Sequence, residues 1–302
     1  MKYKFDVDLD NKNDPRTLAF DRIASGSAVL DVGCACGDFA TVLKKYKNCD
    51  IYGMEYDIES IETAKQTGAF TKIDRVDLNN FNEAEYDGYK NKFDFIIYTD
   101  VLEHLLYPQN VLKIFKKFLA KDGRFILSIP NIAHGSIKAN LLLDRWDYTD
   151  LGLLDRTHLR FFTYKTIPSF LGDINLGIDK FWPTWFPPTG TQPNDPYPNL
   201  PPEIVKFIQG DVHAHIGQYV MECSARTADS DIILNNMAIL DLNIEDFRDI
   251  VNKYSYINPR NKVYVLKYIM NFIFEKLSYG KNKERFKEKK EKYKKKLDSS
   301  RR

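Results

Sequence analysis

Short apolar runs alternate with amphipathic segments through the first 130 residues of the chain. Residues 93–99, FDFIIYT, form an almost continuous apolar run, which is typical of a strand buried on both faces of a sheet. Residues 108–120 instead repeat apolar positions with a helical period. The two patterns predict strands at 28–33, 51–55, 72–76, 93–99 and 124–130, and intervening helices that end near 46, 67 and 120. Strands that alternate with helices indicate a doubly wound, mostly parallel α/β sheet.

The pattern changes after Pro130. Residues 131–163 are rich in Arg, His, Trp and Tyr, and we interpret them as a lid or insert that contacts the acceptor. Segments 177–182 and 215–225 are predicted to complete a seven-stranded sheet. Between them, residues 183–202 hold eight of the thirteen prolines. Proline disrupts helices and central strands, so this segment is predicted to be a long loop.

The C-terminal part has a different character, so we place the main domain at 1–228 and a helical extension at 229–302. Within it, residues 261–277 are apolar apart from one polar stripe, and residues 281–302 carry a net charge of +8. The whole chain carries +2, which leaves −6 for the rest. An apolar helix followed by a basic run predicts peripheral contact with an anionic membrane rather than nucleic acid. The alternatives are a solvated helix, or packing on the body or on another subunit of a homo-oligomer.

Composition narrows the class of protein. A hydrophobic fraction of 43% supports a folded core. The four cysteines lack the paired spacing of a zinc site, and the Glu103-His104 pair has no further ligand at helical spacing, so we expect no metal. The charged start MKYKFDVDLD does not resemble a signal peptide, and no run of 18 apolar residues is present. We therefore expect a cytoplasmic protein with reduced thiols, at most peripheral to the inner face of a membrane.

The clearest chemical signal is a glycine-bearing turn after the first strand. Residues 31–37 read DVGCACG, and glycines there let a ligand approach the backbone at a helix N-terminus. Glu55 ends the second strand, where an acid can accept hydrogen bonds from a ribose diol. Asp38 replaces the third glycine of a dinucleotide motif and would repel a pyrophosphate, which disfavours a dehydrogenase. A nucleoside cofactor without phosphates, such as S-adenosylmethionine, fits better.

Three segments carry a family resemblance. VLDVGCACGDFA, GMEYD and FDFIIYTDVLEHL resemble the first, second and fourth motifs of class I S-adenosylmethionine-dependent methyltransferases. Ala35 stands where the family has its middle glycine. The resemblance covers residues 28–130 and implies a Rossmann-like methyltransferase fold. It also implies S-adenosyl-L-methionine as cofactor and S-adenosyl-L-homocysteine as product.

The same resemblance implies which residues bind the cofactor. Glu55 would hold both ribose hydroxyls, and Thr99 would lie beside the sulfonium. The implied cofactor residues are, in chain order, Asp31, Gly33, Cys34, Gly37, Glu55, Tyr56, Asp77, Leu78, Thr99 and His104.

A further block, residues 130–163, resembles a branch of these methyltransferases often found with glycosyltransferases in bacterial surface-polysaccharide pathways. That branch implies O-methylation of a sugar, nucleotide sugar or lipid-linked glycan. Two alternatives stay open. One is methylation of another small molecule, such as a quinone precursor, and the other is a non-catalytic cofactor-binding or scaffold protein.

An alcohol acceptor needs a general base, and histidine suits that role. His134 and His158 lie beyond the fifth strand, at the sheet edge where open α/β folds bind ligands. Asp155 precedes His158 by three residues and could orient its ring on a helical turn. The alternative is that His158 only braces the insert.

Aromatic and basic side chains of the insert are candidates for acceptor binding. Trp146 and Tyr148 could stack on a sugar face, or they could belong to the core. Arg156 and Arg160 could bind an acidic or phosphate-bearing acceptor, or they could form salt bridges within the lid.

Overall fold

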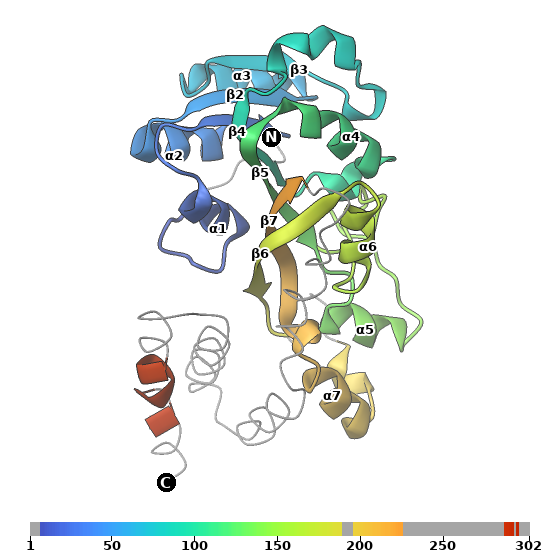
Figure 1. Cartoon of the computed structure of the whole chain (residues 1–302). Coiled ribbons are helices and arrows are strands. Elements are labelled where there is room, and N and C mark those ends of the chain that lie inside the picture. The colour runs from blue at the N-terminus through green and yellow to red at the C-terminus, as the bar shows by residue number, and fades with distance from the viewer. Residues whose placement is uncertain (1–6, 189–195, 226–286, 293, 296–302) are drawn as a thin grey trace.

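The computed structural model describes residues 7–188, 196–225, 287–292 and 294–295. Its body is a seven-stranded sheet in the order β3-β2-β1-β4-β5-β7-β6, with helices on both faces (Figure 1). The strands are β1 (Ala28–Val32), β2 (Asp50–Glu55), β3 (Lys72–Arg75), β4 (Phe93–Thr99), β5 (Leu119–Pro130), β6 (Leu176–Trp185) and β7 (Ile216–Ala225). Strand β7 runs antiparallel to β5 and β6, whereas the other neighbours are parallel. The doubly wound, mostly parallel, seven-stranded sheet predicted from the sequence is therefore confirmed.

Short helices connect the strands. The α-helices are α1 (Pro15–Arg22), α2 (Asp38–Lys47), α3 (Ile58–Gln66), α4 (Pro108–Phe115), α5 (Gly135–Leu141), α6 (Thr166–Gly172) and α7 (Pro202–Gln209). The 3₁₀ turns are η1 (Leu78–Asn80), η2 (Glu83–Tyr89), η3 (Leu102–His104), η4 (Lys116–Phe118), η5 (Tyr197–Asn199) and η6 (Val212–His215). The sequence patterns did not predict α1 or α7. Both begin with proline, whose missing N–H costs nothing in the first turn of a helix.

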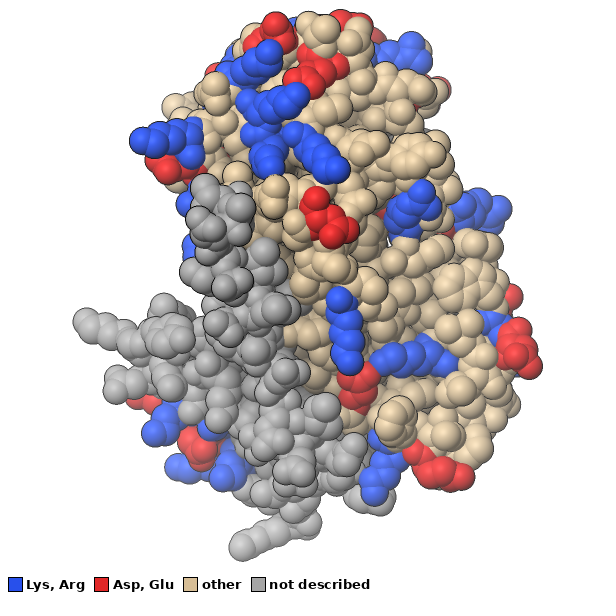
Figure 2. All heavy atoms as spheres, turned by 45° about the vertical axis from the view of Figure 1, so that its right-hand side comes forward, with Lys and Arg blue, Asp and Glu red and all other residues tan. Residues whose placement is uncertain are grey.

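The core lies on both faces of the sheet, as the continuous apolar strands require. On one face Val29 of β1 packs with side chains of α1 and α2, among them Leu43. On the other face Leu30 belongs to a larger apolar cluster that also contains Phe115 of α4 and Leu171 of α6. Most charged side chains of the described residues lie on the surface, where Figure 2 shows both signs mixed on one face, whereas acids such as Asp31 and Glu103 are buried.

Three predicted boundaries were wrong. Helix α4 ends at Phe115 rather than near 120, and β5 already begins at Leu119, which pairs with Phe93 before the register shifts. The predicted loop at 183–202 begins too early, because β6 continues through Pro183 to Trp185. Strand β6 is an edge strand, where a proline is tolerated because its missing N–H faces no neighbour.

The insert and the C-terminal extension differ in how far they are described. Insert residues 131–163 contain α5, and the chain then returns to the sheet, where Ile132 N donates to Phe162 O at 2.9 Å. Residues 287–292 and 294–295 are helical, whereas residues 229–286, with the predicted apolar helix, lie outside the described residues. Among the residues that are described, no helix has the length and hydropathy to cross a bilayer.

Candidate active site

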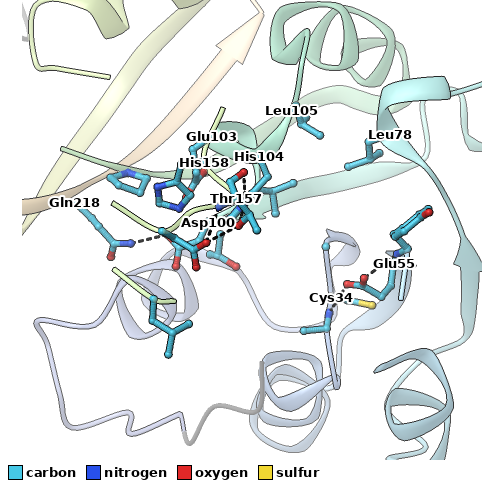
Figure 3. A pocket seen from close by; sticks show the side chains of 18 of the residues that line it. Cys34, Glu55, Leu78, Asp100, Glu103, His104, Leu105, Thr157, His158 and Gln218 are labelled. Carbon is cyan, nitrogen blue, oxygen red and sulfur yellow. Dashed lines mark hydrogen bonds and ion pairs between the residues drawn. The ribbon is translucent and has the colours of Figure 1, made fainter. Parts of the chain in front are cut away.

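A pocket of about 860 Å³ lies at the carboxyl ends of β1, β2 and β4 (Figure 3). One side is lined by the turn after β1, the end of β2 and the residues around η1. The other side is lined by η3, by Phe186 and Gln218, and by six residues of the insert, namely Leu151, Gly152, Leu153, Asp155, Thr157 and His158. The pocket therefore occupies the edge at which open α/β sheets bind ligands, and it joins the two halves that the sequence analysis treated separately.

The turn after β1 adopts left-handed backbone conformations. Gly33 has φ 71° and Gly37 has φ 80°. A Cβ on Gly33 would lie 2.6 Å from a methyl group of Val101, so a larger residue would displace η3 from the pocket. Ala35 has φ 46°, which costs a non-glycine residue roughly 1–2 kcal/mol. The departure from the family motif therefore stores strain at the turn.

Glu55 is held across this turn by its own carboxylate. One oxygen accepts the Ala35 N–H at 2.9 Å, and the other accepts the N–H groups of Tyr56 and Asp57 at 2.7 and 2.9 Å. Hydrogen bonds from amides to a charged acceptor are strong and fix the side chain beside the pocket. Because each carboxylate oxygen has two lone pairs, Glu55 can still accept a hydrogen bond from a ribose hydroxyl.

Asp31 supplies a second acid to the same half of the pocket. It is only 2% exposed, and burial raises its pKa to about 7, with Arg16 opposing and Glu55 adding to the shift. A buried carboxylate is stabilised by a paired cation, and the ammonium group of the methionine moiety is one. The acids at Asp31 and Glu55, together with the apolar side chains of Val76 and Leu78 that line the same pocket, fit S-adenosylmethionine.

Nearly all the cofactor residues implied by the resemblance line the pocket. These are Asp31, Gly33, Cys34, Glu55, Tyr56, Asp77, Leu78, Thr99 and His104. Gly37 is not among the lining residues, because it forms the N-cap of α2 and donates to Cys34 O at 2.9 Å. Burial raises the pKa of the Cys34 thiol, so Cys34 contributes as a neutral side chain. The sequence analysis did not identify Arg16, Asn79 or Leu105 as lining residues.

Glu103, His104 and His158 meet on the other side of the pocket (Figure 3). His158 Nε2 lies 3.9 Å from Glu103 Oε1, and the two imidazole rings are 4.7 Å apart in a T-shaped contact. Among the described residues, neither carboxylate oxygen of Glu103 has a hydrogen-bond partner in another residue. Burial raises the pKa of Glu103 well above its usual range, and the charge of Asp100 raises it further. Sequence spacing could not reveal this cluster, since His158 comes from the insert.

Asp155 takes part in orienting this cluster through Thr157. Its carboxylate accepts from Thr157 N at 2.9 Å and from Thr157 Oγ1 at 2.6 Å. Thr157 Oγ1 in turn lies 3.0 Å from His104 Nδ1. The ring of His158, which Asp155 was expected to orient, has its Nδ1 3.2 Å from the carbonyl of Leu153.

His134 also lines the pocket, but its ring is engaged in the fold. Its Nδ1 lies 2.8 Å from Ser136 Oγ and accepts the Ser136 N–H at 3.3 Å, which caps α5. Its Nε2 contacts the carbonyl of Phe186 at 3.3 Å. Burial lowers the pKa of His134 to about 4. These contacts favour a capping role over the role of a base.

The four predicted acceptor-binding residues of the insert are not among the residues that line this pocket. Trp146 packs edge to face on Phe161 and Tyr148. Arg156 pairs with exposed Asp150 at 2.8 Å, and Arg160 donates to the carbonyl of Leu106. Arg156 thus forms a salt bridge within the lid, which was the alternative interpretation, whereas Arg160 binds the backbone of a residue outside the insert.

Comparison with known proteins places this geometry in a family. Residues 8–179 match the family model of a methyltransferase domain. The chain is 25% identical to the bifunctional methionine biosynthesis protein MetXA/MetW of Rhodopirellula baltica over 61% of this chain and 31% of that protein. It is 26% identical to the ubiquinone biosynthesis O-methyltransferase of Pectobacterium atrosepticum over 35% of this chain and 44% of that protein. The matched part of the chain thus corresponds to about a third to a half of these curated relatives.

Solved structures with a similar chain path include an S-adenosylmethionine-dependent methyltransferase from Mesorhizobium loti. It has a TM-score of 0.47 and 14% identity over 72% of this chain and 99% of that one. Because the family model spans more than half of the sequence and the pocket residues fit the cofactor, the chain belongs to the methyltransferase domain family and its cofactor is S-adenosylmethionine.

Proposed function

We propose that this protein is an O-methyltransferase that moves the methyl group of S-adenosylmethionine to a hydroxyl of a small molecule. The observation that carries the proposal is the position of the Glu103–His104–His158 cluster, which shares one pocket with the cofactor residues Asp31 and Glu55. In the reaction the acceptor oxygen forms a bond to the methyl carbon as the carbon–sulfur bond breaks. The bonding electron pair stays on sulfur, and S-adenosylhomocysteine leaves.

The enzyme has two tasks in such a reaction, alignment and proton removal. The methyl donor is already activated, so alignment of donor and acceptor supplies up to roughly 7–11 kcal/mol of the barrier reduction. A hydroxyl must also lose its proton before or during the attack, which a positioned acid–base group accelerates by about 10²–10⁴-fold. Glu103, His104 and His158 are the groups of the acceptor side that can assist this proton loss.

A sugar or glycan intermediate of a cell-surface polysaccharide is the first candidate acceptor. The support is the resemblance of residues 130–163 to the branch found with glycosyltransferases, together with the fact that six residues of this block, between Leu151 and His158, line the pocket. A lid that carries family-specific residues to the acceptor side is where acceptor choice would be made. A nucleotide sugar or a lipid-linked glycan would present such a hydroxyl.

A phenolic acceptor is the second candidate. Several curated relatives are ubiquinone biosynthesis O-methyltransferases, at 25–27% identity. The acceptor side of the pocket is also lined by apolar side chains that suit an aromatic ring, namely Leu105, Leu151, Leu153 and Phe186. These observations favour a planar aromatic hydroxyl as the alternative to a sugar.

An acceptor panel separates the candidates. The full chain, incubated with S-adenosylmethionine carrying a labelled methyl group, should form S-adenosylhomocysteine only when a suitable acceptor is present. The panel contains nucleotide sugars, a lipid-linked saccharide and catechols, and mass spectrometry identifies the methylated atom. Transfer to a sugar hydroxyl supports the first candidate, and transfer to a catechol oxygen supports the second. Methylation of nitrogen or carbon, with no oxygen product from any acceptor, would overturn the proposed function.

A further inference from the structure

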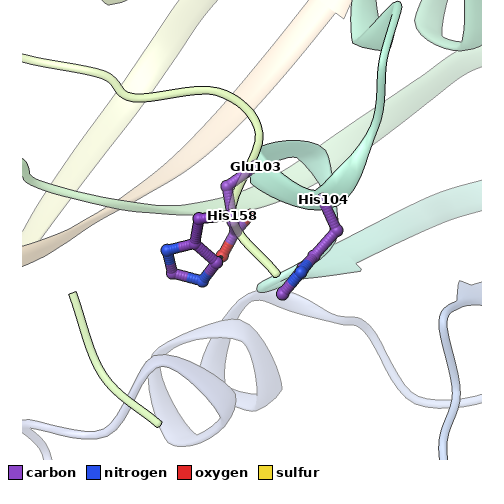
Figure 4. Close-up of side chains that lie close together, drawn as sticks. All are labelled: Glu103, His104 and His158. Atoms are coloured by element: carbon purple, nitrogen blue, oxygen red, sulfur yellow. The ribbon is translucent and has the colours of Figure 1, made fainter. Parts of the chain in front are cut away.

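Glu103, His104 and His158 form a cluster whose donor atoms converge (Figure 4). Each residue offers one nitrogen or oxygen atom, and these atoms lie within 4.8 Å of one another. Imidazole nitrogens and carboxylate oxygens bind a divalent ion at about 2.0–2.2 Å, so that ligand atoms around one ion are roughly 3–3.5 Å apart. The cluster is therefore wider than a loaded site by roughly 1–2 Å at most, which small side-chain rotations can close.

The carboxylate of Glu103 is the strongest sign that something binds here. Glu103 is 1% exposed and lines the pocket, yet no other residue in the described part of the chain forms a hydrogen bond with either of its side-chain oxygens. The nitrogen of His158 at 3.9 Å is too distant for a hydrogen bond. A neutral, protonated Glu103 would still leave a buried hydroxyl without an acceptor. Buried carboxylates are normally paired or coordinate a metal, so the missing partner is a cation.

Both histidines are oriented as metal-binding histidines are. His158 Nδ1 lies 3.2 Å from the carbonyl of Leu153. His104 Nδ1 lies 3.3 Å from the carbonyl of Thr157 and 3.0 Å from its hydroxyl, which itself donates to Asp155. A neutral ring that donates through Nδ1 carries its lone pair on Nε2. Backbone carbonyls that orient the ring in this way are the usual support of histidine ligands.

The backbone holds the two contributing segments together. The carbonyl oxygen of Glu103 accepts the N–H groups of Leu159 and Arg160 at 2.7 and 3.0 Å. These bonds tie η3 to the insert on both sides of the cluster. Backbone hydrogen bonds therefore bring the metal-binding atoms together and leave those atoms themselves available. A preorganised site requires this arrangement.

We propose that Glu103, His104 and His158 bind a divalent first-row transition-metal cation whose open coordination positions face the pocket and take the acceptor's oxygen. Two imidazoles suit zinc, iron or cobalt, and a single carboxylate with open positions suits an ion that also binds substrate oxygen. The role in catalysis rests on the proposed function, whereas the binding site does not. A hydroxyl bound to the cation becomes more acidic, so its proton passes to solvent water and its oxygen attacks the methyl group.

This proposal reverses the expectation, drawn from the sequence, that no metal binds. That expectation rested on helical spacing from Glu103-His104, whereas the third donor, His158, comes from the insert.

Direct titration with Co²⁺ tests the site without cofactor or acceptor. The full chain is first freed of metal by a chelator, and the visible absorption of Co²⁺ then reports its nitrogen and oxygen ligands. One Co²⁺ per chain should bind to the wild type. Glu103→Gln, which keeps the size of the side chain, and His158→Ala should each weaken binding by at least about 100-fold, since even supporting groups contribute 10–100-fold. Glu55→Gln changes an acid on the opposite side of the same pocket and should bind Co²⁺ like the wild type.

Thermal unfolding separates loss of the site from loss of the fold. Co²⁺ or Mn²⁺ should raise the Tm of the wild type but not that of Glu103→Gln. Without metal, Glu103→Gln should melt at or above the wild-type temperature, because the unpaired buried carboxylate is gone. No Co²⁺ binding by the wild type, or equal affinity in Glu103→Gln, would overturn the metal site.

The same experiments distinguish failure of the metal role from failure of the proposed function. Oxygen methylation that continues at full rate in chelator-treated protein would overturn the catalytic role of the cation while leaving the methyltransferase in place. The opposite outcome is Co²⁺ binding that depends on Glu103 in a protein that methylates no oxygen acceptor. That result would support the metal site and contradict the proposed function.

Discussion

The two sides of the pocket are built in different ways. The cofactor side comes from the consecutive ends of β1, β2 and β3, where the carboxylate of Glu55 accepts the N–H of Ala35 in the turn after β1 and the N–H groups of the two residues that follow Glu55. The acceptor side is assembled from η3, the insert, Phe186 and Gln218, and it contains a buried carboxylate, Glu103, that forms no hydrogen bond with any other described residue. On the cofactor side, the protein chain itself therefore holds Glu55 in place. On the acceptor side, the chain leaves Glu103 without a partner, and the proposed partner is a cation.

This difference predicts which measured properties a substitution on each side of the pocket should change. On the cofactor side, a substitution should mainly affect cofactor affinity, because the contacts join the turns that follow neighbouring strands of the sheet. On the acceptor side, a substitution should affect turnover and cation binding, because donors from two segments, η3 and the insert, act together. The predictions below test this separation.

The largest effect is expected for His158→Ala. Loss of this ring removes one member of the group that assists proton loss, so turnover should fall by about 10²-fold or more. Affinity for S-adenosylmethionine should not change. Steady-state rates and calorimetry measure the two quantities. Arg156→Ala, two residues earlier and exposed beside Asp150, is the matched control and should keep near-wild-type turnover. Intact turnover in His158→Ala would show that His158 takes no part in the reaction and would contradict the role proposed for the cluster.

Asp31 should make the stability of the cofactor-free protein depend on pH. Its folded pKa of about 7 lies above the usual 3.8, so between these values the folded state holds a proton that the unfolded state has lost. The free energy of unfolding should therefore fall as pH rises from about 4 to 7, by up to about 4 kcal/mol at ~1.4 kcal/mol per pKa unit. Asp31→Asn should flatten this slope, leaving the part due to Glu103, whose pKa is also raised.

Urea unfolding at several pH values measures the effect of Asp31. Saturating S-adenosylmethionine should also reduce the slope, since its ammonium group stabilises the ionised carboxylate. An Asp31→Asn variant with the wild-type slope would show that Asp31 is not held protonated by burial. The cofactor side would then contain no acid that burial keeps protonated.

Glu55→Ala should weaken S-adenosylmethionine binding by roughly 10–100-fold. A hydrogen bond to a charged group contributes about 1.5–3 kcal/mol, and the variant also leaves the Ala35 N–H without its acceptor. Calorimetry measures the affinity. Glu103→Gln is the control from the other side of the pocket and should bind the cofactor with wild-type affinity. Equal losses in both variants would mean that the two sides are not separate.

The smallest effect is expected at Ala35. Replacing it by glycine relieves the left-handed strain but adds freedom to the unfolded chain, so Ala35→Gly should stabilise the protein by roughly 0.5–1 kcal/mol. Gly33→Ala in the same turn should have the opposite sign, because its Cβ would collide with Val101. Thermal unfolding of the two variants gives the comparison. Destabilisation by Ala35→Gly would contradict the assignment of strain.

Elements that a local sequence pattern defines were predicted well, whereas boundaries that depend on strand pairing were not. The strands near 28–33, 51–55 and 93–99 were predicted within one residue, because each is a short apolar run between turn residues. The end of α4 and the start of β5 were misplaced, since apolar Phe118 and Leu119 fit both a helix and a strand until the pairing of Leu119 with Phe93 decides between them. The end of β6 was misplaced because prolines were taken to exclude a strand. Pro183 is tolerated because β6 is an edge strand, which only the sheet order reveals.

The sequence by itself determined the α/β class, the turn from Asp31 to Gly37, and the acid at Glu55, because the order of strand, turn and helix places these residues together whatever the rest of the chain does. Only the tertiary structure decided the acceptor side. It brought His158 to Glu103 and His104, engaged His134 as a helix cap, and kept Arg156 away from the lining of the pocket. The physical reason is that these positions depend on how the insert packs against η3. That packing is set by long-range contacts such as the hydrogen bonds from Leu159 and Arg160 to Glu103, which no local pattern encodes.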